Sequence, residues 1–310
     1  MSLYRNILAR AWKVAWRNKY LWFFGIFATL IGLGGGEYDM IGRGLSASQA
    51  GQAAFPTWES FVGTGIFSGQ ALDNIADILR EEPFSFFMMV AIGLTILILC
   101  AFLVWLAVVS QIALVNNGAS HLAGKKNDFR GGINAGKKNF WPVLGLNIIN
   151  KIAILSAFLL IGMPFIQSPA RQPLSLIVVL CYILVFIIGV IVALAISFIV
   201  KYSIAYAVIK GNKFVEAIKS GWQLFKKNWL ISMEMALILF LISFIVGLAV
   251  ILAILILAGP FLFSALLLYQ MTSFMGFWIV AGLAFLMFMA VIIISGAILT
   301  TFQVSSWTGL

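Results

Sequence analysis

Six apolar runs, separated by polar segments, constrain this chain more than any other feature of its sequence. They occupy residues 20–36, 84–115, 142–166, 174–200 with an extension toward residue 209, 230–258 and 276–301. About 20 consecutive apolar residues form a helix that crosses the ~30 Å hydrocarbon core of a bilayer. Apolar residues make up 63% of the chain and charged residues 10%, against about 45–50% and about 25% in soluble domains. The sequence therefore predicts an all-α, polytopic integral membrane helical bundle with six transmembrane helices.

Charge is divided between the segments that connect these runs. Of the 20 Lys and Arg, 16 lie in residues 1–19, 116–141 and 201–228, whereas 7 of the 10 acidic residues lie in residues 37–83. Loops rich in Lys and Arg stay on the cytoplasmic side of a membrane. We expect a multi-pass protein of a cell membrane, such as a bacterial inner membrane. Its N-terminus, both basic loops and its C-terminus are then cytoplasmic, and residues 37–83 form an extracytoplasmic insertion. Because topology explains the positive charge, no nucleic-acid partner is expected.

A basic amphipathic segment, residues 214–227, leads directly into the fifth apolar run. Its apolar residues recur at helical steps of three and four, and its charged residues fall on the other side. The apolar positions are Phe214, Ala217, Ile218, Gly221, Trp222 and Phe225. This pattern is typical of a helix that lies on a membrane surface before the chain enters the bilayer. A solvated loop helix that carries some apolar residues is the alternative.

The same unit occurs three times. Residues 8–18 align with residues 218–228 without a gap, pairing Trp12 with Trp222 and Asn18 with Asn228. Residues 133–139 form a third copy that is four residues, about one helical turn, shorter. We expect one membrane domain, 1–310, of three parallel repeats, each an interfacial amphipathic helix followed by a transmembrane hairpin. The predicted repeats are residues 1–117, with the insertion 37–83, 118–210 and 211–310.

Aromatic and basic side chains of the surface segments are candidate lipid-interface anchors. Trp is enriched at the membrane interface, and Lys and Arg attract the anionic lipids of the cytoplasmic leaflet. The candidates are Trp12, Lys13, Trp16, Arg17, Lys137, Lys138, Trp141, Trp222, Lys226, Lys227 and Trp229. They predict anionic lipid as a partner.

Four polar residues inside apolar runs form a candidate intramembrane site: Asn147, Asn150, Lys151 and Glu234. Lys151 lies about ten residues after Trp141, near the middle of the bilayer, where a charge is costly and is often functional. Lys151 either lines a functional path, pairs with Glu234, or reaches the interface or backbone carbonyls without a functional role. A further polar cluster ends the second run, at Ser110, Gln111, Asn116, Asn117 and His121.

Two other features complete the prediction. Gly259-Pro260 is expected to end the fifth helix, and residues 261–275 to form a tight, partly re-entrant or interfacial connection. The sequence contains no GxSxG, HExxH or phosphate-loop motif and no Cys/His/carboxylate cluster with metal-ligand spacing. We expect neither enzyme activity nor a cofactor.

The third surface segment also carries a resemblance. The pattern Phe214…Ala217-Ile218…Gly221-Trp222…Phe225…Trp229, followed by an apolar run, resembles the membrane domain of bacterial glycerophosphoryl diester phosphodiesterases and related six-span families. In those enzymes the membrane domain is attached to a soluble catalytic domain. No such domain is recognisable in these residues, so the resemblance implies a membrane module and not the hydrolase activity.

Two functional hypotheses follow. The first is a non-catalytic membrane module that organises lipid or a membrane partner protein, including a second copy of itself. The alternative is a transporter or permease subunit with a polar path near Lys151, whose energy comes from another chain or a gradient. An intramembrane enzyme ranks last because no catalytic constellation is present.

Overall fold

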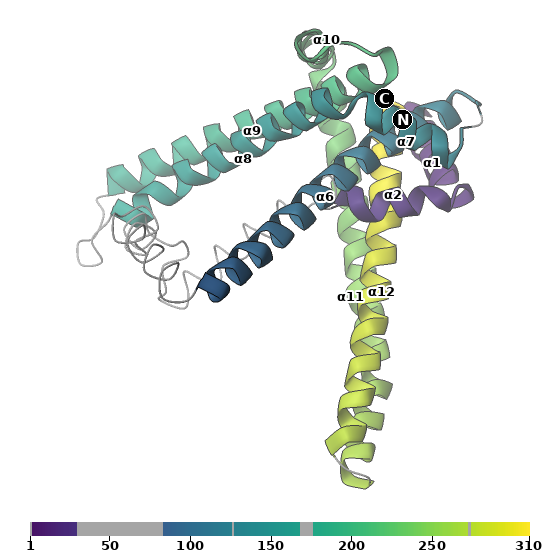
Figure 1. The fold of residues 1–310 in the computed structure, drawn as a ribbon. Coiled ribbons are helices and arrows are strands. Elements are labelled where there is room, and N and C mark those ends of the chain that lie inside the picture. The colour runs from purple at the N-terminus through teal and green to yellow at the C-terminus, as the bar shows by residue number, and fades with distance from the viewer. Residues whose placement is uncertain (1, 30–82, 126, 168–175, 272–273) are drawn as a thin grey trace. The chain divides into compact units, whose positions relative to one another are not determined.

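In the computed structural model, residues 2–29, 83–125, 127–167, 176–271 and 274–310 are described, and every element among them is a helix (Figure 1). The helices are α1 (Ser2–Arg17), α2 (Tyr20–Thr29), α6 (Pro83–Leu122), α7 (Phe129–Lys138), α8 (Phe140–Gln167), α9 (Leu176–Lys210), α10 (Phe214–Lys227), α11 (Trp229–Met271) and α12 (Phe274–Thr308). The predicted all-α class is confirmed for these residues. The insertion 37–82 and the end of the first apolar run, 30–36, lie outside them.

Four of the described helices are long and apolar enough to cross a membrane. They are Pro83–Leu122, Ile183–Lys210, Trp229–Tyr269 and Met275–Thr308. Two apolar helices are shorter, Tyr20–Thr29 and Phe140–Ser156. The ten residues of α2 rise about 15 Å, half the thickness of a hydrocarbon core.

The expected break at Gly259-Pro260 is wrong. Helix α11 continues through Pro260 to Met271, so residues 261–271 are helical and do not form a re-entrant connection. A proline removes one backbone hydrogen bond and crowds the preceding turn. Ending the helix in apolar surroundings would leave more backbone groups unpaired, which is why transmembrane helices tolerate proline.

The C-terminal residues also differ from expectation. Helix α12 runs to Thr308, past the predicted end at residue 301, and Ser305 and Ser306 are fully buried. Hydroxyl groups in this turn donate to carbonyls four residues earlier, from Ser306 to Phe302 (2.8 Å) and from Thr308 to Val304 (2.6 Å). Because these hydroxyls are satisfied within their own helix, a polar sequence packs inside the protein here.

The chain divides into two compact units. One contains Met1–Gly34, Ala107–Lys151 and Leu194–Leu310, and the other contains Gly35–Leu106 and Ile152–Ala193. The first unit, called here the junction unit, holds α1, α2, α7, α10, α11, α12 and one end of each of α6, α8 and α9. Both termini and both basic loops therefore belong to the same unit.

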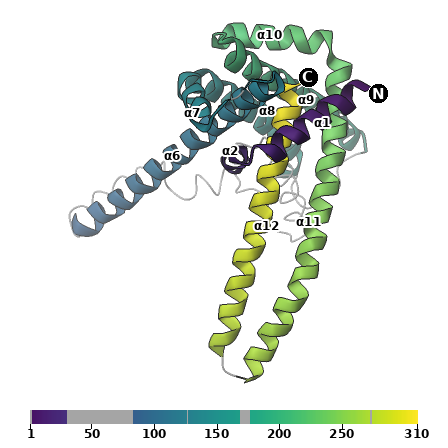
Figure 2. The same cartoon turned by 90° about the vertical axis from the view of Figure 1, so that its right-hand side faces the viewer.

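Helices α11 and α12 form an antiparallel hairpin in the junction unit (Figures 1 and 2). Helix α2 crosses α12, and α1 packs on α12 beyond that crossing. The crossing is close because Gly25 has no side chain: a Cβ there would meet the Ala297 carbonyl oxygen and lie 2.8 Å from Thr301 Oγ1.

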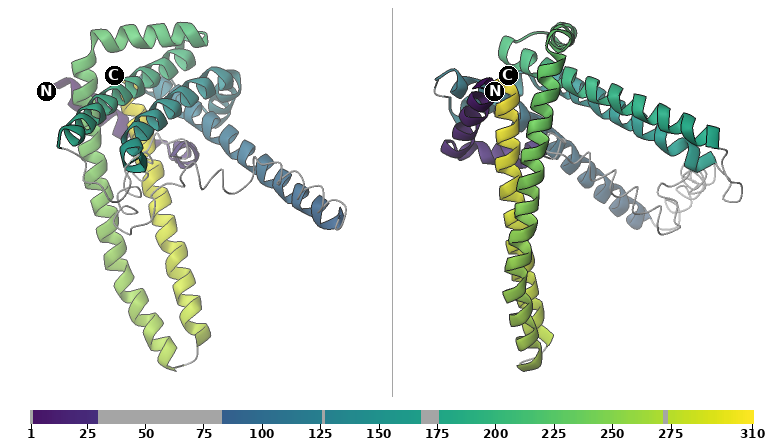
Figure 3. Two further views of the ribbon diagram at one scale, coloured as in Figure 1. Left: turned by 90° about the vertical axis from the view of Figure 1, so that its left-hand side faces the viewer. Right: turned by 180° about the vertical axis from the view of Figure 1, so that it is seen from behind.

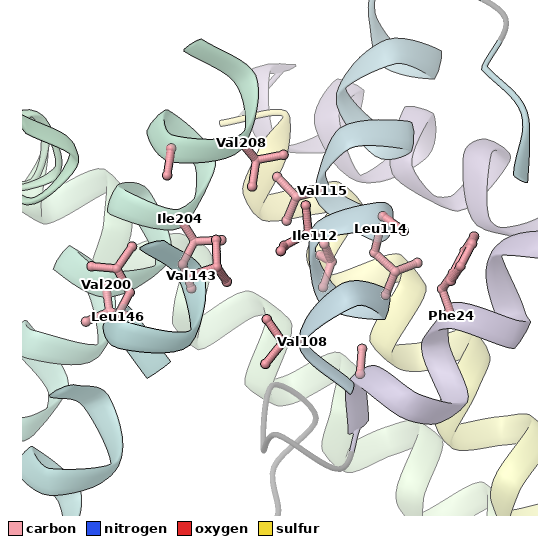
Figure 4. Close-up of a cluster of buried hydrophobic side chains, with 14 of the residues drawn as sticks. Phe24, Val108, Ile112, Leu114, Val115, Val143, Leu146, Val200, Ile204 and Val208 are labelled. Carbon is pink, nitrogen blue, oxygen red and sulfur yellow. The ribbon is translucent and has the colours of Figure 1, made fainter. Parts of the chain in front are cut away.

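The main apolar core of the junction unit joins helices that are far apart in sequence. Val143 and Leu146 of α8 lie with Val200 and Ile204 of α9 (Figure 4). The cluster continues through α6 to Phe24 of α2, and it also includes Ala217 of α10 and Val304 of α12. A second cluster joins Ala11 and Ala15 of α1 to Met235 and Leu239 of α11 and Phe302 of α12.

Small residues let α1, α7 and α10, called here the surface helices, approach the longer helices. A Cβ on Gly136 of α7 would lie 3.1 Å from the Val109 carbonyl oxygen of α6. A Cβ on Gly221 of α10 would lie 2.8 Å from the Ile199 carbonyl oxygen of α9. Helices α7 and α10 thus each pack on the long helix that precedes them. Helix α1 packs on α12.

We predict that Gly221→Ala lowers stability by about 1–3 kcal/mol, because the added methyl group overpacks the α9–α10 contact. The matched control is Gly247→Ala in α11, where a Cβ meets nothing within 4 Å. Thermal unfolding of both purified variants in the same detergent tests this. Equal melting temperatures for the two variants would contradict it.

Candidate functional site

One asparagine links each surface helix to the helix that follows. The side-chain amides of Asn18, Asn139 and Asn228 donate to the carbonyls of Val14 (3.0 Å), Ala135 (3.2 Å) and Leu224 (3.4 Å), respectively. In each case the backbone N–H of the same asparagine donates to the same carbonyl, at 3.2, 3.1 and 3.0 Å. Each asparagine therefore supplies two donors to one carbonyl in the last turn of its surface helix.

The same asparagine starts the next helix. The carbonyls of Asn18, Asn139 and Asn228 accept from the N–H groups of Leu21 (2.9 Å), Val143 (3.3 Å) and Ser232 (3.0 Å). The backbone angles are φ −104° and ψ 17° at Asn139, and φ −128° and ψ 33° at Asn228. Two non-helical residues between α1 and α2, and one at each of the other two turns, are therefore enough to turn the chain from a surface helix into the next helix. We call residues 16–19, 137–141 and 226–229, which contain these turns, the three elbows.

The alignment of the three surface segments with one another matched these asparagines but assigned them no role. It also predicted that the middle surface segment is four residues shorter. Helix α7 has 10 residues and α10 has 14. Because both end immediately before their asparagine, the missing turn is at the start of α7.

The candidate interface anchors are exposed. The exposed fractions are 50% for Trp12, 52% for Trp16, 77% for Trp141, 53% for Trp222 and 53% for Trp229. The candidate cations are exposed as well: Lys13, Arg17, Lys137, Lys138, Lys226 and Lys227. Trp12 and Trp16 stack on each other with their ring centroids 5.6 Å apart, giving α1 a flat aromatic face. Helix α10 runs across the end of α11 (Figure 3).

Acidic groups do not neutralise this surface. The described part of the chain holds three carboxylates, Asp128, Glu216 and Glu234, and none of the candidate cations forms an ion pair there. Glu234 of α11 accepts a hydrogen bond from the Tyr4 hydroxyl of α1. This bond raises the pKa of Tyr4, because the carboxylate stabilises the protonated phenol. The bond therefore attaches α1 to α11 at neutral pH.

The candidate intramembrane residues are only partly brought together. Asn147 of α8 is buried and exchanges hydrogen bonds with Gln111 of α6: Asn147 Nδ2 donates to Gln111 Oε1 (2.6 Å) and Gln111 Nε2 to Asn147 Oδ1 (3.5 Å). Asn150 has a buried Oδ1 without a partner among the described residues. The sequence placed Gln111 in a polar cluster but did not identify it as the partner of Asn147.

Lys151 and Glu234 do not form an ion pair within the described structure. Both side chains are exposed, and Glu234 is bonded to Tyr4 instead. The two residues therefore do not make a single charged site. An exposed lysine on an apolar helix, as Lys151 is on α8, fits either a polar path or a side chain that reaches the membrane interface.

His121 belongs to a network that joins α2, α6 and the segment before α7. The Tyr20 hydroxyl lies 2.7 Å from His121 Nε2 and donates to the Asn127 carbonyl (2.8 Å). Because the hydroxyl has only one hydrogen, Nε2 of His121 donates to Tyr20 in this arrangement. Asn127 in turn donates to Asn117 Oδ1 (2.8 Å), which ties the segment to α6.

The described residues contain no group of three or more His, Cys, Asp and Glu that could hold a metal ion. Cys100 and Cys181 are free and exposed. Comparison with protein-family models, curated proteins and solved structures gave no match. The arrangement of the exposed cations and aromatic side chains is therefore the strongest indication of function.

We predict that the Gln111–Asn147 pair behaves as a coupled unit. Gln111→Leu and Asn147→Leu should each cost about 1–3 kcal/mol. Asn147→Leu leaves the buried Gln111 amide without its partner, and Gln111→Leu leaves Asn147 with only its bond to the Val143 carbonyl. The double variant should lose less than the sum of the two, because neither amide remains. The free energies of unfolding of the four proteins in the same detergent give this double-mutant cycle. Thr95→Ala, which removes an exposed hydroxyl bonded within its own helix, is the control. Strict additivity would refute the coupling.

Proposed function

We propose that this protein is a non-catalytic integral membrane module that organises anionic lipid at the cytoplasmic face of a cell membrane. One observation carries the proposal. Three basic surface helices belong to a single compact unit. Each buries small residues, while its Lys and Arg side chains and a tryptophan within or just after it stay exposed. A lipid interface is the environment that suits aromatic side chains beside cations that form no ion pair within the described residues.

The proposed topology has six spans, with the N-terminus, both basic loops and the C-terminus in the cytoplasm. The grouping of α1, α7, α10 and the C-terminal turn of α12 in the junction unit supports this arrangement. It agrees with the distribution of Lys and Arg in the sequence. Residues 37–83 are then extracytoplasmic.

The proposed repeat organisation has units 1–117, 118–210 and 211–310. Its support is the hydrogen-bond pattern shared by Asn18, Asn139 and Asn228, together with the one-turn difference between α7 and α10. A further similarity is that each surface helix packs against a long helix: α1 against α12, α7 against α6 and α10 against α9.

Electrostatic attraction to lipid is large enough to matter. A Lys or Arg near an anionic membrane surface contributes on the order of 1 kcal/mol, and salt weakens this attraction. The surface helices α1, α7 and α10 carry Arg5, Arg10, Lys13, Arg17, Arg130, Lys137, Lys138, Lys219, Lys226 and Lys227. Their combined attraction would hold anionic lipid around the protein against exchange with neutral lipid.

We predict that phosphatidylglycerol raises the melting temperature of the reconstituted protein relative to phosphatidylcholine. The difference should shrink in high salt, because mobile ions screen the exposed cations. Lys219→Gln, Lys226→Gln and Lys227→Gln together should reduce it, whereas the three Lys→Arg replacements should preserve it. Thermal unfolding in nanodiscs of each lipid measures the effect. The same melting temperature in both lipids would reject the proposal.

The alternative, a transporter or permease subunit, is favoured by one observation. Buried polar atoms without partners among the described residues, Ser110 Oγ, Asn117 Nδ2 and Asn150 Oδ1, lie on α6 and α8, the helices that hold the Gln111–Asn147 pair. Unsatisfied buried polar groups are uncommon and sometimes line a functional path. Lys151 follows Asn150 on α8.

We predict that cysteine at position 151, in a chain without Cys100 and Cys181, resists small polar thiol reagents from both sides of the membrane. The expectation follows from the lipid-organising function, which needs no aqueous path. Cysteine at the exposed surface position Gln223 is the positive control. Labelling at position 151 that a candidate solute blocks would favour the transporter alternative.

A further inference from the structure

We propose that each elbow binds the phosphate of one anionic phospholipid headgroup. The inference rests on the proposed function, because it requires the surface helices to lie at the anionic leaflet. It goes further in assigning three discrete sites, at residues 16–19, 137–141 and 226–229, in place of a diffuse attraction over the whole surface.

Six of the 15 exposed Lys and Arg side chains of the described residues lie at these three turns. Each elbow contains two of them, and their charges are not compensated by an ion pair within the described residues. They are Arg17 and Lys19, Lys137 and Lys138, and Lys226 and Lys227. Lys binds phosphate as a compact point charge, and Arg adds a planar fork of donors. Two neighbouring cations therefore fit an anionic phosphate diester.

Packing determines which way these cations face. In α7, Gly132 and Gly136 are buried against α6, seven and three residues before Asn139. In α10, Gly221 is buried against α9, seven residues before Asn228. At about 100° per residue, the two positions directly before each asparagine point away from this buried stripe. The lysines at these positions therefore face outward because the opposite side of the helix cannot rotate away from its partner.

The asparagine holds the turn in a defined geometry. At Asn139 and Asn228, two donors close the surface helix and one carbonyl opens the next helix. The backbone that carries the lysines of α7 and α10 is consequently held beside the first turn of α8 and α11. A site held by such contacts loses less conformational entropy when it binds than one built from freely moving lysines.

An exposed tryptophan accompanies the cations at each elbow. Trp141 and Trp229 lie in the first turn of α8 and α11, three and two residues after the lysine pairs, and Trp16 precedes Arg17. Tryptophan rings occupy the headgroup level of a bilayer, with an apolar body and a polar N–H. Cations beside an interfacial ring match a phospholipid, whose charged phosphate adjoins its apolar chains. Free phosphate has no apolar part and would not use the ring.

The test compares two variants that lose the same charge. Lys226→Gln with Lys227→Gln removes the cations of one elbow. Lys125→Gln with Lys213→Gln removes two exposed cations that lie outside the surface helices and the elbows. Each protein is purified in mild detergent with a defined mixture of phosphatidylglycerol and phosphatidylcholine, and native mass spectrometry counts the lipids that remain bound.

We expect the intact protein to retain up to three phosphatidylglycerol molecules. The elbow variant should lose about one third of them, and the control variant none. Asn228→Ala, which keeps both lysines, should weaken retention at the same elbow by several fold because the turn is less well held. Short-chain phosphatidylglycerol should displace the retained lipid at concentrations at which inorganic phosphate does not.

The failures of the two proposals are distinguishable. Equal losses from the elbow and control variants would overturn discrete sites while leaving a diffuse lipid attraction. Displacement by inorganic phosphate as readily as by short-chain phosphatidylglycerol would overturn a lipid site in favour of a simple anion site. Equal retention of phosphatidylglycerol and phosphatidylcholine by the intact protein would overturn the proposed function together with the elbow sites.

Discussion

The hydrogen bonds of three asparagines are the interactions on which the rest of this structure depends. Where a surface helix meets the next helix, one helix leaves carbonyls unpaired and the other leaves N–H groups unpaired. Asn18, Asn139 and Asn228 each supply two donors and one acceptor at this position. The chain can therefore change direction within one or two residues and keep the surface helix close to the helix that follows.

Close packing of small residues holds one face of each surface helix against the longer helices. Gly136 and Gly221 bring α7 and α10 against backbone atoms of α6 and α9, and Ala11 and Ala15 bury one side of α1 against the α11–α12 hairpin. One face of each surface helix is thereby inaccessible. The aromatic and cationic side chains have only the opposite face available, and these cations form no ion pair within the described residues.

The polar groups inside the protein have a different role from the exposed cations. Gln111 and Asn147 satisfy each other across α6 and α8, and the hydroxyls of α12 satisfy their own helix. Such bonds allow polar residues to lie within apolar packing at little cost. Glu234 is bonded to Tyr4 at the α1–α11 contact, so this carboxylate also holds helices together. The interior polar residues mostly join helices, whereas the exposed cations, six of which lie at the elbows, form no ion pair within the described residues.

The amino-acid pattern alone determined the helical class, the surface segment at 214–227 and the one-turn difference between α7 and α10. These follow from periodicity and length, which are local properties. Tertiary structure decided the partner of Asn147, the bond from Tyr4 to Glu234 and the packing of α1 on α12. Those contacts join residues 36 and 230 positions apart or opposite ends of the chain, and no local pattern specifies them. Gly259-Pro260 is a further case in which the local sequence does not determine the structure. Glycine and proline favour the end of a helix, but α11 continues through them. Ending the helix there would leave backbone groups unpaired in lipid.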